Sequence, residues 1–203
     1  ANYVNGCLLR RKAGQLSDEE LGTILEEINA STTHASETIK RIRSFIQGRA
    51  SERHPVDLNA VTRQAIALVS SDADRAGVTI AFIPERYLPK VTVDEIQIAH
   101  VILNLLINSI QAIAHSPAES GLIHVRLAQE DDWTVTCSVS DTGPGMDGDA
   151  IDHAFDQFYT TKPEGLGMGL AISRSIVESH DGKLTLKSNP GEGTTARFSI
   201  AFD

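Results

Sequence analysis

The chain has 203 residues, of which 41% are hydrophobic, so it can bury one good core and carry a small helical appendage. Its formal net charge of −9 argues against a nucleic-acid-binding protein, which would need a basic surface to displace phosphate counterions. Cys7 and Cys137 are the two cysteines, and they show no metal-ligand or disulfide spacing, which favours a reducing, cytoplasmic location.

The first fifty residues have the pattern of a helical hairpin. Ser17-Asp-Glu-Glu20 has the form of a capping box, and apolar residues then recur at largely helical spacing as far as Ile46. No core-forming strand follows until Val56, so pairing with a second copy is favoured over packing on the chain's own domain. Pro55 requires extended backbone before it, and we place the domain boundary between residues 50 and 51.

The next segment predicts a helix over 58–75, strands over 78–83 and 91–93, and a long helix over 94–114. Asp94 and Gln97 are spaced like a second capping pair at the start of that long helix. Its longest apolar stretch, 101–107, is interrupted by Asn104 and falls short of the roughly 20 residues of a membrane helix. We therefore expect no membrane contact by this chain.

The remaining elements complete a sheet. Apolar residues alternate with polar ones over 123–127 and 133–139, where Trp133, Val135, Cys137 and Val139 are expected on the buried face. A glycine-rich loop, a helix over 168–179 and strands over 183–187 and 195–202 follow. The sum is an α+β fold, a two-layer sandwich with helices on one face of a mixed sheet.

Two amides lie one helical turn apart on the long helix, Asn104 and Asn108, with Gln111 close to the same stripe. Burying such carboxamides without partners would cost about 1–3 kcal/mol each. They are expected to face water, a ligand or a hydrated ion, and a merely solvent-exposed stripe is the alternative.

Asp141 ends a predicted strand and enters a turn in which Gly143 and Gly145 would let the backbone approach a flat ring. A carboxylate there can accept a hydrogen bond from the amino group of adenine, where guanine has a carbonyl. An ordinary turn is the alternative, since Asp, Gly and Pro all favour turns.

The glycine run Gly165-Leu166-Gly167-Met168-Gly169-Leu170 opens a helix, where free N–H groups and the helix dipole favour phosphate. It matches neither the Walker nor the Rossmann motif. Alone, this run is weak support for a nucleotide site.

Taken in order, these stretches resemble the kinase core of two-component sensor histidine kinases of the oxygen- and nitrogen-sensing type. The segment 104–112 resembles the N box, 141–145 the first glycine box, 155–162 the F box, 165–173 the second glycine box and 191–194 the terminal glycine–threonine element. The resemblance covers residues 55 to 203. It implies a Bergerat-type ATP-binding fold behind a dimerising, phosphoacceptor hairpin.

The resemblance also implies roles for individual residues. Asn108 would bind Mg²⁺, Asn104 would be a polar group beside phosphate or metal, and Asp141 would recognise adenine. The nucleotide would further contact residues of all the boxes: Gln111, Gly143, Gly145, Lys162, Gly165, Leu166, Gly167, Met168, Gly169, Leu170 and Thr194. Phe155 and Phe158 would attach the lid to the domain.

The catalytic residues would be Asn104 and Asn108. Gyrase- and MutL-type relatives carry a glutamate general base where Asn104 stands, and an amide cannot take a proton from water. This favours phosphoryl transfer to another acceptor over rapid ATP hydrolysis. The implied acceptors are a histidine and then an aspartate in the receiver domain of a response regulator.

None of the seven histidines has the acidic neighbour of a phosphoacceptor on a first hairpin helix. Because Ala1 begins inside what resembles a helix, we expect a piece of a longer protein, homodimeric through the hairpin, whose acceptor histidine precedes Ala1. Such a piece would not phosphorylate itself. A non-catalytic ATP-sensing module, or a serine kinase or ATPase of the same superfamily, is the alternative.

Overall fold

The computed structural model describes residues 17, 20–22, 24, 52–116, 120–162 and 167–202. By its internal contacts the chain divides into two units, Ala1–Ala50 and Ser51–Asp203. In the first unit the capping box is confirmed: the Ser17 N–H donates to the Glu20 carboxylate at 2.9 Å, and the Glu20 N–H donates to Ser17 Oγ at 3.2 Å. The predicted hairpin otherwise lies outside the described residues.

The second unit is built on a five-stranded sheet with the order β2-β4-β5-β7-β6. The strands are β2 Val78–Ile83, β4 Gly121–Gln129, β5 Thr134–Asp141, β6 Lys183–Ser188 and β7 Thr194–Ala201. β2 runs parallel to β4 and the other pairs are antiparallel. A separate small sheet pairs β1 His54–Val56 with β3 Val91–Val93.

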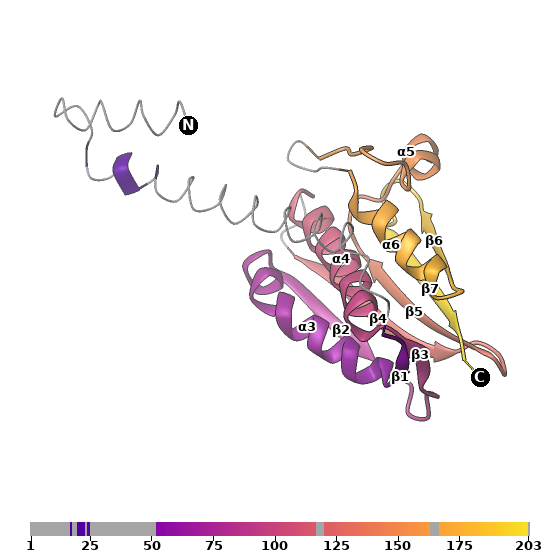
Figure 1. The fold of residues 1–203 in the computed structure, drawn as a ribbon. Coiled ribbons are helices and arrows are strands. Elements are labelled where there is room, and N and C mark those ends of the chain that lie inside the picture. Colours follow the sequence, from indigo (N-terminus) through magenta and orange to yellow (C-terminus); the bar gives the residue numbers. More distant parts are fainter. Residues whose placement is uncertain are drawn as a thin grey trace. The chain divides into compact units, whose positions relative to one another are not determined.

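Three long helices, α3 Leu58–Arg75, α4 Glu95–Ala114 and α6 Gly169–Ser179, lie on the same face of the five-stranded sheet (Figure 1). A short helix, α5 Gly148–His153, precedes α6. The predicted α+β class, with helices on one face of a mixed sheet, is confirmed. Neither the three-residue β1 nor the six-residue α5 was predicted, because each is too short to show a hydrophobic period.

Alternation in the strands decides which side chains enter the core. Ile123, Val125 and Leu127 of β4 are at most 1% exposed, and the intervening His124 and Arg126 are exposed. Such one-sided burial needs a helical layer on one face only.

The prediction for Trp133 is wrong, since its side chain is 67% exposed. Trp133 precedes β5 at the tip of the β4–β5 hairpin, one residue beyond the last paired position, Thr134. Alternation alone does not show where a strand leaves the covered part of a sheet.

α4 is the central helix, with eight buried residues along its length. Among the described residues, α4 is the one helix that is long and apolar enough to cross a membrane, with a mean hydropathy of 1.6. The sequence criterion, which counted only its longest uninterrupted apolar run, was therefore too strict. The same composition suits the core helix of a folded domain, and α4 contacts α3, α6 and the sheet.

The N-terminus of α4 is joined to the C-terminus of α6. Asp94 Oδ1 accepts from the N–H groups of Ile96 and Gln97 at 3.1 Å, as predicted for an N-cap. The Asp94 N–H, however, donates to Nε2 of His180 at 3.0 Å, so the predicted reciprocal bond from Gln97 is replaced by a tertiary contact.

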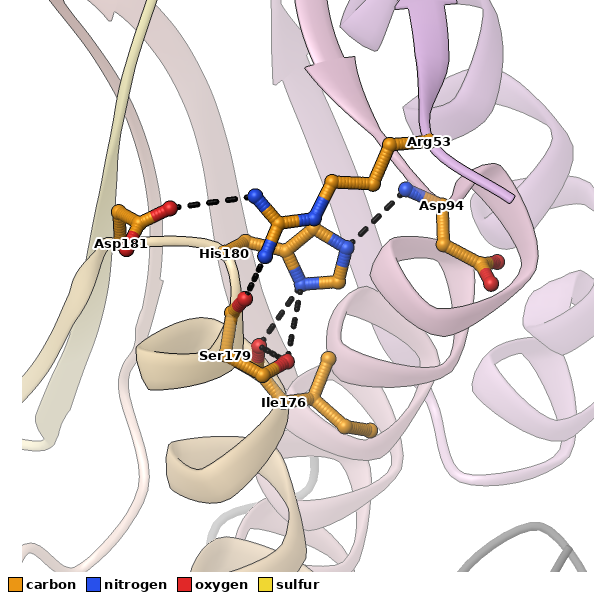
Figure 2. A network of polar contacts seen from close by, with 6 residues as sticks. All are labelled: Arg53, Asp94, Ile176, Ser179, His180 and Asp181. Carbon is orange, nitrogen blue, oxygen red and sulfur yellow. Dashed lines mark hydrogen bonds and ion pairs between the residues drawn. The ribbon is translucent and has the colours of Figure 1, made fainter. Parts of the chain in front are cut away.

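Figure 2 shows this network from close by. His180 is 3% exposed, and its Nδ1–H donates to the carbonyl of Ile176 at 2.8 Å. Arg53 reaches the same helix end, where it binds the Asp181 carboxylate at 3.1 Å and donates to the Ser179 carbonyl. The segment before β1, the start of α4 and the end of α6 are thereby held together.

Candidate functional site

Asp141, the last residue of β5, is the buried acid of the predicted site. It is 8% exposed, and Oδ1 accepts from the N–H groups of Gly143 at 3.0 Å and Thr194 at 3.2 Å. Oδ2 accepts from the Ser109 hydroxyl at 2.9 Å. A carboxylate offers about four acceptor positions. Among the described residues these three bonds leave one acceptor position for a donor from outside.

Two tertiary contacts create this arrangement. β5 pairs with β7 so that Asp141 stands opposite Thr194, and α4 packs on β5 and brings Ser109 to the carboxylate. Ser109 was not among the predicted site residues. Its signal was a hydroxyl on the buried stripe of α4, between the core residues Leu105 and Ile113, because a buried polar group there needs a partner.

The glycines of the Asp141 turn serve close packing. A Cβ at Gly143 would lie 2.9 Å from Asp141 Oδ1. Gly145 has a φ of +71°, and a Cβ there would lie 1.9 Å from the Asn189 carbonyl oxygen. Gly193, which the sequence analysis did not single out, has a φ of +80° and would place a Cβ 1.9 Å from the Asp141 carbonyl oxygen. Any side chain at Gly145 or Gly193 would push this turn apart.

α4 contacts the glycine run and the first turns of α6 through Asn104. Its Nδ2 donates to the Ser173 hydroxyl of α6 at 2.9 Å, and a Cβ at Gly169 would lie only 2.6 Å from its Oδ1. Asn108, one turn further along α4, is half-buried, and its carboxamide forms no hydrogen bond within the described part of the chain. Asn108 can therefore offer an amide oxygen to a ligand.

The first turn of α6 has N–H groups with no side-chain acceptor among the described residues. Its N-cap, Met168, forms no side-chain capping bond, and the first turn holds no acidic residue. The leading N–H groups and the positive end of the helix dipole favour an anion. Leu170 packs its side chain against the core, so a contribution from this residue would come from its backbone.

The segment before α6 is partly described. The Lys162 ammonium donates to Oε1 of Gln111 on α4 at 2.8 Å, which joins two residues assigned to the nucleotide. Gly167 accepts from the Phe158 N–H at 3.0 Å and has a φ of +64°. Gly165 and Leu166 lie outside the described residues.

The expectation for the two phenylalanines is half wrong. Phe155 packs against the core, and the Arg174 guanidinium lies 5.2 Å from its ring centre. Phe158 is 70% exposed and has a φ of +68°, so it points away from the domain. Its backbone lies against Gly167, a contact that the sequence pattern does not reveal.

The described residues contain no group of three or more His, Cys, Asp or Glu side chains that could hold a metal ion. A hard cation bound through Asn108 would thus take most of its oxygen ligands from a bound anion and water, which is the usual coordination of Mg²⁺. The residues fit a purine with an exocyclic amine at Asp141 and an anion near Asn104, Asn108 and the start of α6.

Comparison with known proteins agrees with this chemistry. Residues 93–203 match the family described as "Histidine kinase-, DNA gyrase B-, and HSP90-like ATPase". The chain is 32% identical over 98% of its length to the sensor protein TdiS of Thauera aromatica, of which it covers 36%. It spans less than two fifths of the length of the curated relatives it matches.

Two solved structures are similar in fold. Full-length ShkA in complex with AMPPNP matches 93% of the chain with a TM-score of 0.74 and 25% identity, and the match covers 40% of ShkA. The histidine kinase ThkA in complex with the response regulator TrrA matches 99% of the chain with a TM-score of 0.79 and 24% identity, and the match covers 57% of that protein.

Proposed function

This chain belongs to the histidine kinase-, DNA gyrase B-, and HSP90-like ATPase family, among relatives that are sensor kinases, and we propose that it is the Mg-ATP-binding catalytic domain of a protein-histidine kinase. The observation that carries the proposal is the Asp141 carboxylate, with three acceptor positions filled from within the domain and one left.

Adenine suits that remaining position because its exocyclic amine is a donor, whereas guanine presents a carbonyl oxygen. Ser109 and Thr194 hold the carboxylate in place before the base arrives, so little ordering would be needed on binding. The similar protein ShkA was solved in complex with AMPPNP, which is an adenine nucleotide.

The phosphates would lie toward Asn104, Asn108 and the first turn of α6. Asn108 supplies an amide oxygen for Mg²⁺, and Lys162 supplies positive charge from the segment before α6. Bound Mg²⁺ would neutralise the charge of the phosphate oxygens. Asn104, anchored to Ser173, would position the γ-phosphate and cannot act as a general base toward water. This favours transfer to a protein side chain over hydrolysis.

The acceptor we propose is a histidine nitrogen on the dimerisation helix of the longer protein. That nitrogen attacks the γ-phosphorus, the bond to the β–γ bridging oxygen breaks, and ADP leaves. The phosphoryl group then passes to an aspartate in a response-regulator receiver domain, the class of partner present in the ThkA complex. His180, the histidine followed by an acidic residue, is buried and serves the fold instead.

Calorimetric titration with Mg-ATP tests the nucleotide assignment. Asp141→Asn keeps the shape of the side chain but loses the charge and one acceptor oxygen, so ATP binding should become undetectable. Asp74→Asn, on the exposed surface of α3, is the matched control and should bind like the parent chain. GTP should bind at least tenfold more weakly than ATP, about 1.4 kcal/mol.

Unchanged ATP affinity in Asp141→Asn would remove the adenine assignment. A separate experiment addresses transfer: after incubation with radiolabelled ATP, the 203-residue chain should carry no acid-labile phosphate. A labelled peptide containing His34 would show that His34 is the acceptor and would contradict this expectation.

A further inference from the structure

The five-stranded sheet has a second face on which no described helix packs. Because α3, α4 and α6 all lie on one side (Figure 1), the inward side chains of β4, β5 and β7 are fully buried. The alternate side chains point the other way. The strand register aligns Arg126, Ser138, Arg197 and Thr185 in one row across that open face.

Charge is distributed unevenly between this face and the rest of the chain. Within the fully described strands the open face carries four permanent cations and no carboxylate: Arg126, Lys183, Lys187 and Arg197. Glu130, just after β4, binds Arg197 at 2.6 Å and offsets one of these four cations. The whole chain has a net charge of −9, so a basic surface here stands out against an acidic molecule.

The open face is also hollowed. Short side chains such as Thr136, Ser138 and Thr195 stand between Arg126, Lys187 and Arg197, and together with Glu130 they line a depression of about 390 Å³. The Thr136 hydroxyl at the bottom of the depression donates to the Ala128 carbonyl at 3.2 Å, so its hydrogen is already used within the sheet. Attraction for a ligand would therefore come from the basic side chains. Arg126 and Lys187 line this depression, and neither forms an ion pair with any described residue.

Two apolar side chains of β2, Ala81 and Ile83, border the basic side chains. The parallel register places Ile83 beside Arg126 and Ala81 beside His124. Ile83 is 48% exposed, although it is a large β-branched residue in a strand. A surface that combines cations with an exposed aliphatic edge suits a ligand that carries both carboxylates and an apolar side chain.

We propose that this open sheet face docks an acidic segment of a partner protein that also contributes an apolar side chain. Nucleic acid is a poorer fit, because no outward-facing residue of the described strands is a Phe, Tyr or Trp on which a base could stack, and the net charge is negative. An anionic membrane is disfavoured by the same net charge. The proposal is independent of the nucleotide site.

A fluorescein-labelled peptide of Asp and Glu with two leucines is the probe, and a peptide with Asn and Gln in place of the acids is its control. Fluorescence anisotropy with the 203-residue chain should show saturable, salt-sensitive binding of the acidic peptide. Arg126→Gln with Lys187→Gln should weaken it about tenfold. Arg75→Gln with Lys90→Gln removes the same charge from α3 and the β2–β3 connection and should change it less than twofold.

Amide chemical shifts provide the second readout, and they should move in β4, β6 and β7. The proposal would be overturned if both double variants lost the same affinity, if the shifts were confined to the helical layer, or if no binding were seen at millimolar peptide. So would binding of the Asn/Gln peptide, of oligothymidylate or of phosphatidylserine vesicles as tightly as the acidic peptide. ATP titration of the same samples checks that the variants are folded.

Discussion

Gly169→Ala tests the close contact between Asn104 on α4 and Gly169 at the start of α6. A Cβ at Gly169 would lie 2.6 Å from Asn104 Oδ1, while ordinary contacts begin at 3.4 Å, so the Asn104 carboxamide would have to move by about 0.8 Å (3.4 − 2.6). Directed along its 2.9 Å bond to Ser173, this movement would stretch the bond to about 3.7 Å (2.9 + 0.8), beyond hydrogen-bonding range.

The cost in stability should be small. A lost hydrogen bond removes about 0.5–1.5 kcal/mol, and alanine in a helix returns up to about 1 kcal/mol relative to glycine. We therefore expect the free energy of unfolding to change by less than about 1 kcal/mol. Affinity for Mg-ATP should fall about tenfold, because Asn104 would no longer be held beside the first turn of α6.

Urea denaturation and calorimetric titration on the same sample separate the two effects. Gly148→Ala is the matched control, since Gly148 also lies in the first turn of a helix and a Cβ there would meet nothing within 4 Å. An affinity for ATP within twofold of the parent in Gly169→Ala, or an equal loss in Gly148→Ala, would refute the role given to this contact.

Three further outcomes follow from the structure. His180→Ala should lower the free energy of unfolding by about 1–3 kcal/mol, because it leaves the part-buried Asp94 N–H unpaired, while the Ile176 carbonyl keeps its bond from the Ser179 hydroxyl. The half-exposed Arg53→Ala should cost less than about 1 kcal/mol, and equal costs in urea denaturation would contradict this. The hydrogen bond to Asp156 raises the pKa of His153 above its ordinary 6.5. The contact therefore stabilises the fold below pH 6.5, and this stabilisation is lost as the pH rises through the pKa of the folded state. NMR titration should show the His153 pKa return toward 6.5 in Asp156→Asn, and an unchanged pKa would argue against the contact. Burial raises the pKa of Cys137 to about 12. Iodoacetamide at pH 8 should therefore leave this thiol unmodified in the folded chain and modify it in urea, as measured by mass spectrometry. Labelling of Cys137 in the folded chain would show that the sheet opens.

Local patterns predicted the regular elements well. α3, β2 and β3 have the predicted bounds, and α4 begins one residue later because Asp94 is its cap. These elements are long or strongly periodic, or are bounded by residues that stop or start a helix by their own chemistry: Gly77, with a φ of +66°, follows the cap of α3, and Asp94 caps α4. Trp133 and Phe158 were misjudged because the cover over a residue depends on elements distant in the chain.

In the site, too, local chemistry was predictable and tertiary contacts were not. Asn104, Asn108, Asp141 and the glycine run predicted an adenine nucleotide only when taken in order, through their resemblance to the boxes of histidine kinases. Their partners were not predictable. Ser109 reaches Asp141 across 32 positions, and Ser173 reaches Asn104 across 69.

The sequence by itself determined the longer helices, most of the strands and the fold class, since periodicity and capping are properties of neighbouring residues, and its resemblance to sensor histidine kinases pointed to ATP. Only the tertiary structure decided that Asp141 keeps one free acceptor position, that His180 closes the start of α4, and that basic side chains from three strands share one uncovered face. Each of these depends on strand register and on helix packing, which join residues far apart in the chain and leave no local trace.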